Sequence, residues 1–368
     1  MSLNWLVANH FRNLTEIQVR PAPGLNVFYG QNGSGKTSLL EACYFLGVGR
    51  SFKDASADPV IERGHHQLLL RAGVRSGDRE HQMGMTRDRD GTRSLRINGE
   101  KVLRASEMAR VLPTLVLGPQ TVDLLLGPPD QRRRFLNWGL FHVEQSEPFT
   151  PLWDEANRCL RQRNELLRSA RGSNKEIAAW SKQLAEASEK LHQRRQDYIQ
   201  KFQPVYEATV AAISGMEDVQ LSYFRGWKES ESLYETYIQD IDIDKKRGFT
   251  QKGFQRADVR ITVSGQAAAK VCSRGELKAL VWSMVLSQGL LSQRAQTDTE
   301  RRETLYLVDD LASEFDEAHR QRVCEFLAAT GQQILFTGVE SEPLVEACGS
   351  KTIEGMFHVK HGQIIQER

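Results

Sequence analysis

The stretch that decides the fold runs Gly30-Gln31-Asn32-Gly33-Ser34-Gly35-Lys36-Thr37. It fits the phosphate-binding pattern G-x-x-x-x-G-K-[S/T] at every fixed position, directly after a strand-like run at 25–29 and directly before a helical run at 38–42. Glycines let the main chain curl so that successive N–H groups face one anion, and the N-terminus of the following helix adds partial positive charge. The stretch therefore predicts a nucleoside triphosphate site, with ATP and magnesium (Mg2+) as the expected ligands.

Two side chains of this loop have predicted roles of their own. Lys36 is expected to neutralise the β- and γ-phosphates, and the Thr37 hydroxyl is expected to ligate magnesium. A glycine-rich turn without a ligand is the alternative, and the flanking strand and helix disfavour it. The predicted nucleotide-binding residues of the segment are Gly30, Gln31, Asn32, Gly33, Ser34, Gly35, Lys36, Thr37 and Ser38.

A phosphate-binding loop needs an acidic partner at the end of a neighbouring strand, because magnesium takes oxygen ligands and a parallel sheet brings strand ends together. The apolar run 304–308 supplies it, since Asp309 and Asp310 follow at once. Asp309 is predicted to lie on the metal side, and Asp310 to orient or deprotonate the attacking water. The alternative for Asp310 is that it only caps the next turn.

A third motif is Cys272-Ser273-Arg274-Gly275-Glu276-Leu277-Lys278. Ser273 and Gly275 open a helix there, so that N–H groups and a hydroxyl are available to phosphate oxygens. Taken alone, Ser273 followed three residues later by Glu276 is also an ordinary capping box. Its position some thirty residues before Asp309 favours the phosphate interpretation.

The order of elements predicts an α/β fold with more than one domain, since 368 residues exceed the usual size of a single one. The first hundred residues show short strands, with an Asn98-Gly99 pair that favours a tight hairpin. Two helices at 151–170 and 175–213 predict a short antiparallel arm, and 242–252 has the composition of a linker. The predicted division is an N-terminal part of an ATPase lobe at 1–110, a mainly helical lobe at 111–255, and a C-terminal part of the ATPase lobe at 256–368.

Composition excludes several classes of protein. Charged residues make up 26% of the chain, and no run of about 18 apolar residues predicts a membrane span. The N-terminus lacks the pattern of a secretory signal, and five scattered cysteines without a C-x-x-C pair favour free thiols over disulfides or a zinc site. We therefore expect a cytoplasmic protein. The net charge of +2 does not by itself indicate a nucleic-acid partner.

The three motifs, in this order and separated by an inserted middle region, resemble the ABC-type ATPase heads of the SMC group, and in particular a bacterial DNA-repair branch of that group. The resemblance extends over nearly the whole chain. Besides the motifs above it rests on Phe11-Arg12-Asn13, Gly49-Arg50-Ser51-Phe52-Lys53, Gly127-Pro128-Pro129, Arg132-Arg133-Arg134-Phe135-Leu136 and Ala312-Ser313-Glu314-Phe315-Asp316.

The resemblance implies a sheet-containing ATPase lobe with a smaller helical lobe, in which ATP draws two copies into a clamp around DNA. It places Ser273 of one copy on the γ-phosphate held by the other, Gln120 at a magnesium-sensing position, and Arg12 and Asn13 near the nucleotide. It also implies weak, DNA-stimulated ATP hydrolysis, binding to DNA at gaps or single-strand to double-strand junctions, and the partner proteins RecR and RecO in recombinase loading.

Two residues depart from the family pattern, Glu276 where glutamine is common and Thr337 where many ABC-type heads have histidine. Both positions bear on hydrolysis rather than on nucleotide binding. Two basic clusters are equally compatible with contacts to a DNA backbone and with ordinary helix faces. They comprise Arg132 to Arg134 and the set Arg158, Arg161, Arg163, Arg168 and Arg171.

Two other functions share parts of this pattern. The nucleotide-binding subunit of a membrane transporter uses the same loop, signature and acidic strand, but the helix predicted at 175–213 is longer than that class needs. A small-molecule kinase would use the phosphate-binding loop, but it gives no reason for the residues 273–276. The DNA-binding ATPase is therefore the leading hypothesis.

Overall fold

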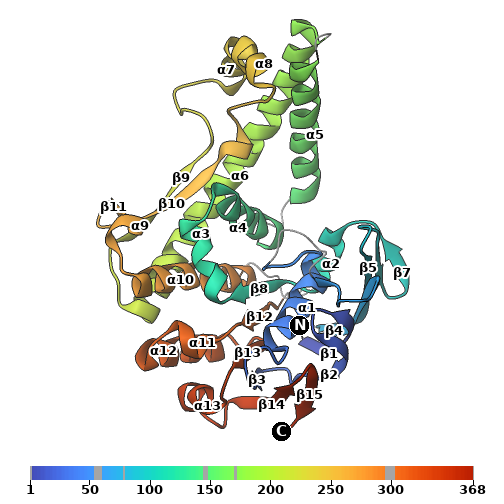
Figure 1. Ribbon diagram of the computed structural model, residues 1–368. Coiled ribbons are helices and arrows are strands. Elements are labelled where there is room, and N and C mark those ends of the chain that lie inside the picture. The colour runs from blue at the N-terminus through green and yellow to red at the C-terminus, as the bar shows by residue number, and fades with distance from the viewer. Residues whose placement is uncertain are drawn as a thin grey trace. The chain divides into compact units, whose positions relative to one another are not determined.

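The computed structural model describes residues 2–53, 60–77, 79–143, 148–169, 172–294 and 303–367. The chain forms two compact units, of which unit 1 comprises Met1–Val122, Thr209–Gly215 and Arg274–Arg368, and unit 2 comprises Asp123–Ala208 and Met216–Ser273 (Figure 1). The main boundaries between the two units lie at 122/123 and 273/274. The boundaries predicted from the sequence lie at 110/111 and 255/256. The division predicted from the sequence, with a helical lobe between two parts of one ATPase lobe, stays a prediction.

The first sheet of unit 1 carries the phosphate-binding loop. Its five parallel strands and one antiparallel edge strand lie in the order β15 (Gln363–Gln366), β14 (Ile353–Lys360), β3 (Leu25–Tyr29), β13 (Ile334–Gly338), β12 (Leu305–Val308) and β8 (Thr114–Leu117). Strands β12 and β13, both expected from their apolar runs, pair in parallel with Leu307 opposite Leu335. Because β3 pairs with β13 in the same direction, the carboxyl ends of β3, β13 and β12 meet at one edge.

The second sheet of unit 1 is antiparallel. Its strands lie in the order β2 (Leu14–Val19), β1 (Ser2–Phe11), β4 (Gln67–Ser76), β5 (Arg79–Asp88), β6 (Arg93–Ile97) and β7 (Glu100–Val102). The predicted hairpin turn joins β6 and β7, with Asn98 at φ 53° and Gly99 at φ 84°. Both values belong to the left-handed region that asparagine and glycine adopt most easily.

Helix α1 (Lys36–Val48) belongs to a core shared with both sheets of unit 1. Its side chains are apolar on most sides, and Leu39, Phe45 and Leu46 are fully buried. A helix without a polar face has to be covered on all sides. The remaining described helices of unit 1 are α2 (Ala105–Val111), η2 (Pro119–Val122), α10 (Arg274–Arg294), α11 (Leu311–Glu314), α12 (Glu317–Ala329) and α13 (Glu342–Cys348).

Unit 2 is mainly helical and contains the expected arm. Helices α5 (Phe149–Arg168) and α6 (Asn174–Ser214) contact each other through Arg163 and Ser181, whose Nε and Oγ lie 2.8 Å apart. From Thr209 onward, α6 belongs to unit 1. The other elements are α3 (Asp123–Leu126), α4 (Pro129–His142), α7 (Leu233–Gln239), α8 (Ile241–Arg247), η3 (Phe254–Arg256), α9 (Ala268–Val271) and a sheet of β11 (Gln266–Ala267), β10 (Asp258–Val263) and β9 (Val219–Phe224).

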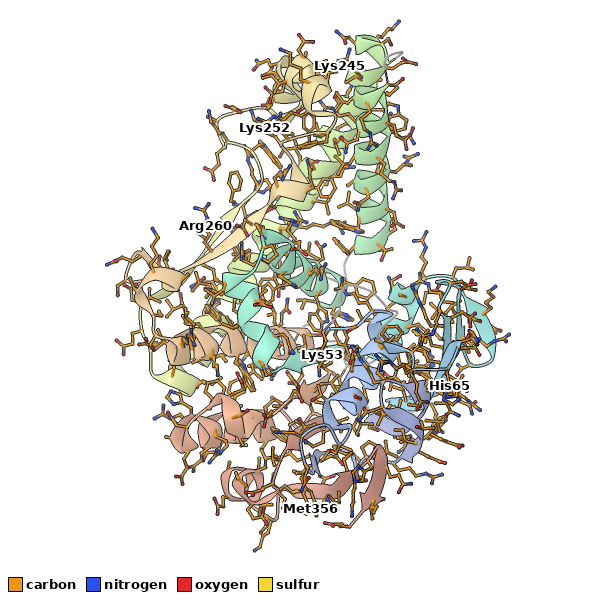
Figure 2. The ribbon with its side chains drawn as sticks, in the orientation of Figure 1. Lys53, His65, Lys245, Lys252, Arg260 and Met356 are labelled. Carbon is orange, nitrogen blue, oxygen red and sulfur yellow. The ribbon has the colours of Figure 1, made fainter. Side chains whose placement is uncertain are left out.

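The run 242–252 is not a linker. Its first half is helix α8, where Asp244 is only 1% exposed and accepts a hydrogen bond of 2.7 Å from the buried guanidinium of Arg163. Arg163 also donates to Thr250 Oγ1 at 2.6 Å and to the Tyr237 carbonyl at 3.2 Å. Two of the polar residues that suggested a linker, Asp244 and Thr250, are thus partners of a charge buried inside unit 2, whereas Lys245 and Lys252 of the same run pair with other side chains (Figure 2).

The basic clusters separate into residues with different surroundings. Arg163 is fully buried, and Arg132 is paired with Asp258 at 2.6 Å, so that both serve the packing of unit 2. Arg134 is about half exposed and pairs with Asp130 one helical turn away. Arg171 lies outside the described residues. For Arg132 and Arg163, contact with a DNA backbone is therefore the disfavoured interpretation.

Replacing Arg163 with methionine is expected to lower the free energy of unfolding by about 3–5 kcal/mol, because Asp244 would remain buried without its cationic partner. Denaturant unfolding followed by circular dichroism measures the change. Arg134→Met removes an exposed pair of the same kind and is the matched control, for which little change is expected. Equal effects of the two substitutions would contradict a structural role for the buried pair.

Candidate nucleotide-binding site

The loop between β3 and α1 has a main-chain path that requires glycine at two positions. Gly30 has φ 148°, and a Cβ atom there would lie 2.2 Å from the Val359 carbonyl oxygen. Gly35 has φ 116°, and its Cβ would lie 2.9 Å from a methyl group of Leu14. Helix α1 begins directly after this curl, so that the N–H groups of its first turn have no acceptor within the helix and face the phosphate-binding loop.

The Lys36 side chain contacts the main chain of the phosphate-binding loop. Its Nζ donates hydrogen bonds to the carbonyls of Gly30 at 2.6 Å and Gln31 at 2.9 Å. Burial lowers the pKa of the Lys36 amine, while the charges of Asp310 and Asp309 offset part of that effect. The amine therefore lies between the loop and the two carboxylates, where a phosphate chain could replace its carbonyl partners.

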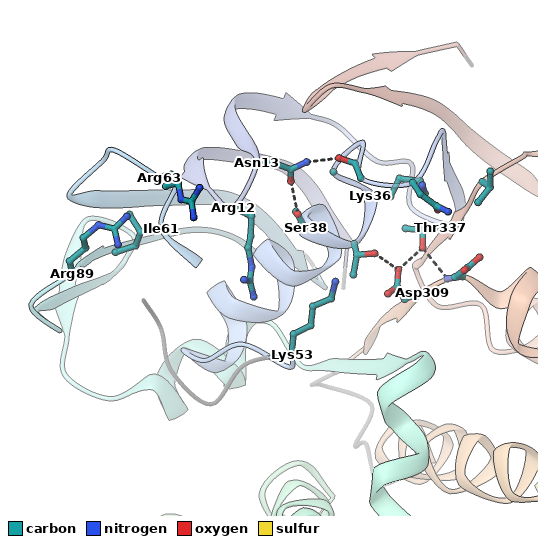
Figure 3. A pocket seen from close by; sticks show the side chains of 16 residues that line it. Arg12, Asn13, Lys36, Ser38, Lys53, Ile61, Arg63, Arg89, Asp309 and Thr337 are labelled. Carbon is teal, nitrogen blue, oxygen red and sulfur yellow. Dashed lines mark hydrogen bonds between the residues drawn. The ribbon is translucent and has the colours of Figure 1, made fainter. Parts of the chain in front are cut away.

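A hydroxyl–carboxylate network joins α1 to the strands β12 and β13 (Figure 3). Thr37 Oγ1 donates to Asp309 Oδ1 at 2.9 Å, and Thr337 Oγ1 donates to the same oxygen at 2.8 Å. Thr337 also accepts a hydrogen bond of 3.0 Å from the main-chain N–H of Asp310. The residue that departs from the family pattern thus positions both aspartates.

Asp310 lies at the start of the short helix α11 in a left-handed conformation, with φ 54°. Its carboxylate makes no capping hydrogen bond to that helix, so the capping alternative is not supported. The side chain instead lines the same cavity as Lys36. That position leaves its oxygens available to a ligand or to water.

The donor set at this edge of the sheet fits magnesium. Magnesium prefers oxygen ligands in a regular geometry and binds nucleotides through one or two carboxylates together with phosphate oxygens. The Thr37 hydroxyl and the Asp309 carboxylate are in direct contact and lie in the same cavity. When bound, magnesium would neutralise charge on the β- and γ-phosphates.

Arg12 and Asn13, which were expected near the nucleotide, both line the cavity. Asn13 donates to the Gly33 carbonyl at 2.9 Å and accepts from Ser38 Oγ at 2.7 Å, and it thereby fixes the loop to the start of α1. The Arg12 guanidinium makes two hydrogen bonds to the buried Glu41 carboxylate, at 2.9 and 2.7 Å. Asn13 is thus a positioning residue for the loop, and Arg12 adds an anchored cation.

The cavity has a volume of about 680 Å³, within the usual size of a small-molecule site. Five cationic side chains line it against two carboxylates, a balance that suits a polyanion. The sequence analysis missed Arg63, Arg89, Ile61 and Val339 altogether, and it included Lys53 and Thr337 without predicting them as site residues. The lining residues are Arg12, Asn13, Asn32, Gly33, Gly35, Lys36, Thr37, Ser38, Lys53, Ile61, Arg63, Arg89, Asp309, Asp310, Thr337 and Val339.

Six predicted site residues are not among those that line this cavity: Gly30, Gln31 and Ser34, which belong to the phosphate-binding loop itself, and Gln120, Ser273 and Gly275, which lie outside the loop. Gln120 is exposed in η2, although the chain passes close by at Gly118, whose added Cβ would lie 3.0 Å from that of Asp309. Ser273 and Gly275 are exposed where α10 begins. An exposed position is what a contact with a second copy would require, so their predicted role across a dimer stays a prediction.

Comparisons with known proteins cover the whole chain. The family described as RecF/RecN/SMC N terminal domain matches residues 2–365. A DNA replication and repair protein RecF from Pseudomonas aeruginosa (strain LESB58) is 40% identical over 372 residues, with 100% of this chain and 98% of the relative covered. The RecF protein of Azotobacter vinelandii is 40% identical over 367 residues, with 100% and 99% covered.

Solved structures support the same fold. The recombination mediator protein RecF-ATP of the RecFOR pathway superposes with a TM-score of 0.86 at 22% identity, covering 100% of this chain and 97% of the other. An Smc head domain from Pyrococcus furiosus gives a TM-score of 0.58 at 12% identity, with 99% and 96% covered. The expected α/β architecture of an ABC-type ATPase head is confirmed. Of the helices that the structure describes, none is long and apolar enough to cross a bilayer.

Proposed function

The chain belongs to the RecF family of SMC-type ATPase heads, and we propose that it is an ATP-dependent DNA-binding mediator of repair and recombination. One observation carries the proposal: the Thr37 hydroxyl of the phosphate-binding loop contacts the strand-end carboxylate of Asp309 at 2.9 Å, inside a cavity lined by five cations. This arrangement suits a magnesium-bound triphosphate.

The proposed reaction is weak, DNA-stimulated hydrolysis of ATP to ADP and phosphate. Asp310 would accept a proton from the attacking water, Lys36 would hold the γ-phosphate, and Gln120 would sense the metal from η2. The assignment of Asp310 is supported by two observations: its carboxylate makes no capping hydrogen bond to α11, and it lines the same cavity as Lys36. Slow hydrolysis would then time the opening of a dimer.

The proposed switch is dimerisation. ATP that binds a dimer better than a monomer shifts the equilibrium by its differential affinity. Ser273 and Gly275 would reach the γ-phosphate held by a second copy, and their exposure at the start of α10 supports this. DNA gaps or junctions between single and double strands are the proposed target, RecR and RecO the proposed partners, and the cytoplasm the proposed location.

Light scattering of the full-length chain, with and without ATP and in the presence of a gapped duplex, tests the proposal. We expect a doubling of mass with ATP and magnesium. Ser273→Arg places a bulky cation at the proposed contact and should abolish the dimer, while nucleotide binding by the monomer stays within about threefold of the wild type. Ser350→Arg changes an exposed serine elsewhere in unit 1 and is the control.

Two results would contradict this model. Loss of monomer nucleotide binding in the Ser273 variant would mean that this residue serves its own copy's site. A monomer that persists with ATP and DNA would remove the gating step, even if ATP were bound.

A further inference from the structure

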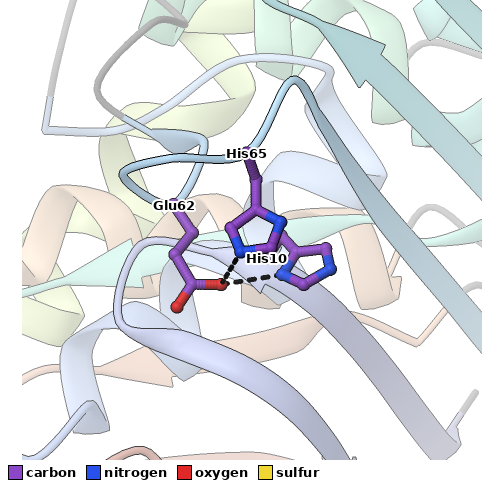
Figure 4. A group of neighbouring side chains, drawn as sticks. All are labelled: His10, Glu62 and His65. Atoms are coloured by element: carbon purple, nitrogen blue, oxygen red, sulfur yellow. Dashed lines mark hydrogen bonds and ion pairs between the residues drawn. The ribbon is translucent and has the colours of Figure 1, made fainter.

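Two histidines and a glutamate lie next to one another in unit 1 (Figure 4). His10 is the next-to-last residue of β1, and Glu62 and His65 belong to the loop that precedes β4. His10 Nδ1 lies 2.7 Å from Glu62 Oε2, and His65 Nε2 lies 3.8 Å from the same oxygen. One ligand atom from each residue lies within 4.8 Å of the other two.

The main chain holds these residues in place. The Glu62 N–H donates to the His10 carbonyl at 2.9 Å, and the His65 N–H donates to the Glu62 carbonyl at 3.2 Å. Arg89, which lines the cavity, donates to the carbonyls of His65 at 2.7 Å and Glu62 at 3.0 Å. His10 itself has φ 56°, a conformation uncommon for a residue other than glycine. The backbone thus sets the positions of the three residues. The His10 and His65 rings are stacked, with centroids 3.7 Å apart and planes inclined by 13°, so one imidazole has to rotate about its side-chain bonds for both rings to bind one ion.

The carboxylate is oriented by an outer partner. Thr15 Oγ1 donates to Glu62 Oε1 at 2.8 Å, which leaves Oε2 facing the two imidazoles. Burial raises the pKa of the Glu62 carboxyl, but hydrogen bonds from His10 and Thr15 and the charges of both histidines outweigh it, so the net pKa is lowered. Metal sites are commonly built in this way, with ligands oriented by a second hydrogen bond.

We propose that His10, Glu62 and His65 form a binding site for a divalent transition-metal ion, with zinc as the best fit. Two imidazoles and one carboxylate are ligands that zinc accepts at about 2.0–2.2 Å, with water completing a tetrahedron. The side chains are 34%, 20% and 44% exposed, respectively, which leaves room for that water. Magnesium prefers oxygen ligands alone, so this site is chemically distinct from the one at Thr37 and Asp309.

Occupation of the site would fasten β1 to the loop 60–66. Ile61 and Arg63, on either side of Glu62, line the nucleotide cavity, and a metal ion would restrict the wall that they form. Coupling between two sites is reciprocal, so zinc is expected to tighten nucleotide binding, and nucleotide to tighten zinc binding, by a factor of about 5 or more. This coupling rests on the proposed function, whereas the metal site itself does not.

Calorimetric titration of the nucleotide-free full-length chain with zinc tests the site. One ion per chain should bind. His65→Ala and His10→Ala should each weaken binding at least about 10-fold. His66→Ala alters the exposed neighbouring histidine, which contributes no ligand to the group, and should bind zinc as the wild type does.

A thiol pair is the competing zinc site, since Cys324 Sγ and Cys348 Sγ lie 2.7 Å apart. Cys348→Ser removes it and should leave zinc binding unchanged, and bound cobalt should lack the charge-transfer absorption of a thiolate ligand. Zinc binding that survives in both histidine variants, or that is lost in Cys348→Ser, would overturn the proposal. Circular dichroism of His10→Ala and His65→Ala confirms that a loss of binding is not a loss of folding.

Discussion

Replacement of Lys36 by methionine is expected to weaken ATP binding at least about 100-fold and to abolish ATP-dependent dimerisation. The amine contributes charge-assisted hydrogen bonds to phosphate oxygens, each worth about 1.5–3 kcal/mol, and methionine has a similar length but no charge and no donor. The substitution also removes the contacts of Lys36 with the carbonyls of Gly30 and Gln31. Titration with a fluorescent ATP analogue measures the affinity, and light scattering measures the dimer.

Lys351→Met is the matched control, because Lys351 is exposed in unit 1 and does not line the cavity. It should bind ATP as the wild type does. An affinity of the Lys36 variant within about threefold of the wild type would mean that the triphosphate binds outside the glycine-rich loop. The assignment of this cavity as the nucleotide-binding site would then be wrong, even though the family of the chain is known.

The second large effect concerns Asp310. Asp310→Asn keeps the shape of the side chain but removes its ability to accept a proton, so we expect hydrolysis to fall by about 10²–10⁴-fold while ATP binding is retained. Single-turnover measurements of phosphate release give the rate. Because the bound ATP is then not hydrolysed, the dimer should also persist. Its lifetime, measured by light scattering, should lengthen in proportion to the fall in the hydrolysis rate.

Glu340→Gln is the control for this variant, since Glu340 is an exposed carboxylate just after β13 that does not line the cavity. Its hydrolysis rate should not change. If Asp310→Asn lost ATP binding as well as hydrolysis, the carboxylate would act on the nucleotide or its metal instead of on water. If the rate were unaffected, another group would be the base.

The parts of the site that could be predicted from the sequence are those whose residues form a short, continuous motif. The loop from Gly30 to Thr37 has a fixed spacing between a strand and a helix, and Asp309 ends an apolar run. Parallel pairing of β3, β13 and β12 then brings the two together without further information. That is why Thr37 and Asp309 were expected to meet, and they lie 2.9 Å apart.

Other parts depend on contacts between distant segments. Arg63 and Arg89 reach the cavity from the antiparallel sheet and its loops. Arg89 is positioned by the main-chain carbonyls of Glu62 and His65, and contacts to main-chain carbonyls leave no pattern of side chains in the sequence. Arg163 and Asp244 are 81 residues apart, and only the folded unit shows that they neutralise each other. From sequence alone, the polar composition of 242–252 predicts a solvent-exposed segment. The prediction fails here because a distant residue neutralises the charge of Asp244 inside unit 2.

Arg12 is anchored by Glu41, and Arg89 by two main-chain carbonyls, and this anchoring favours the binding of a polyanion. A flexible cation loses rotamer entropy when it closes on an anion, at roughly 0.5–1.5 kcal/mol for each side chain immobilised. The Arg12 and Arg89 side chains are each held by two hydrogen bonds within the protein itself. The positive charges of the cavity are thus preorganised for a polyanion. Binding then costs less side-chain rotamer entropy than it would with flexible cations.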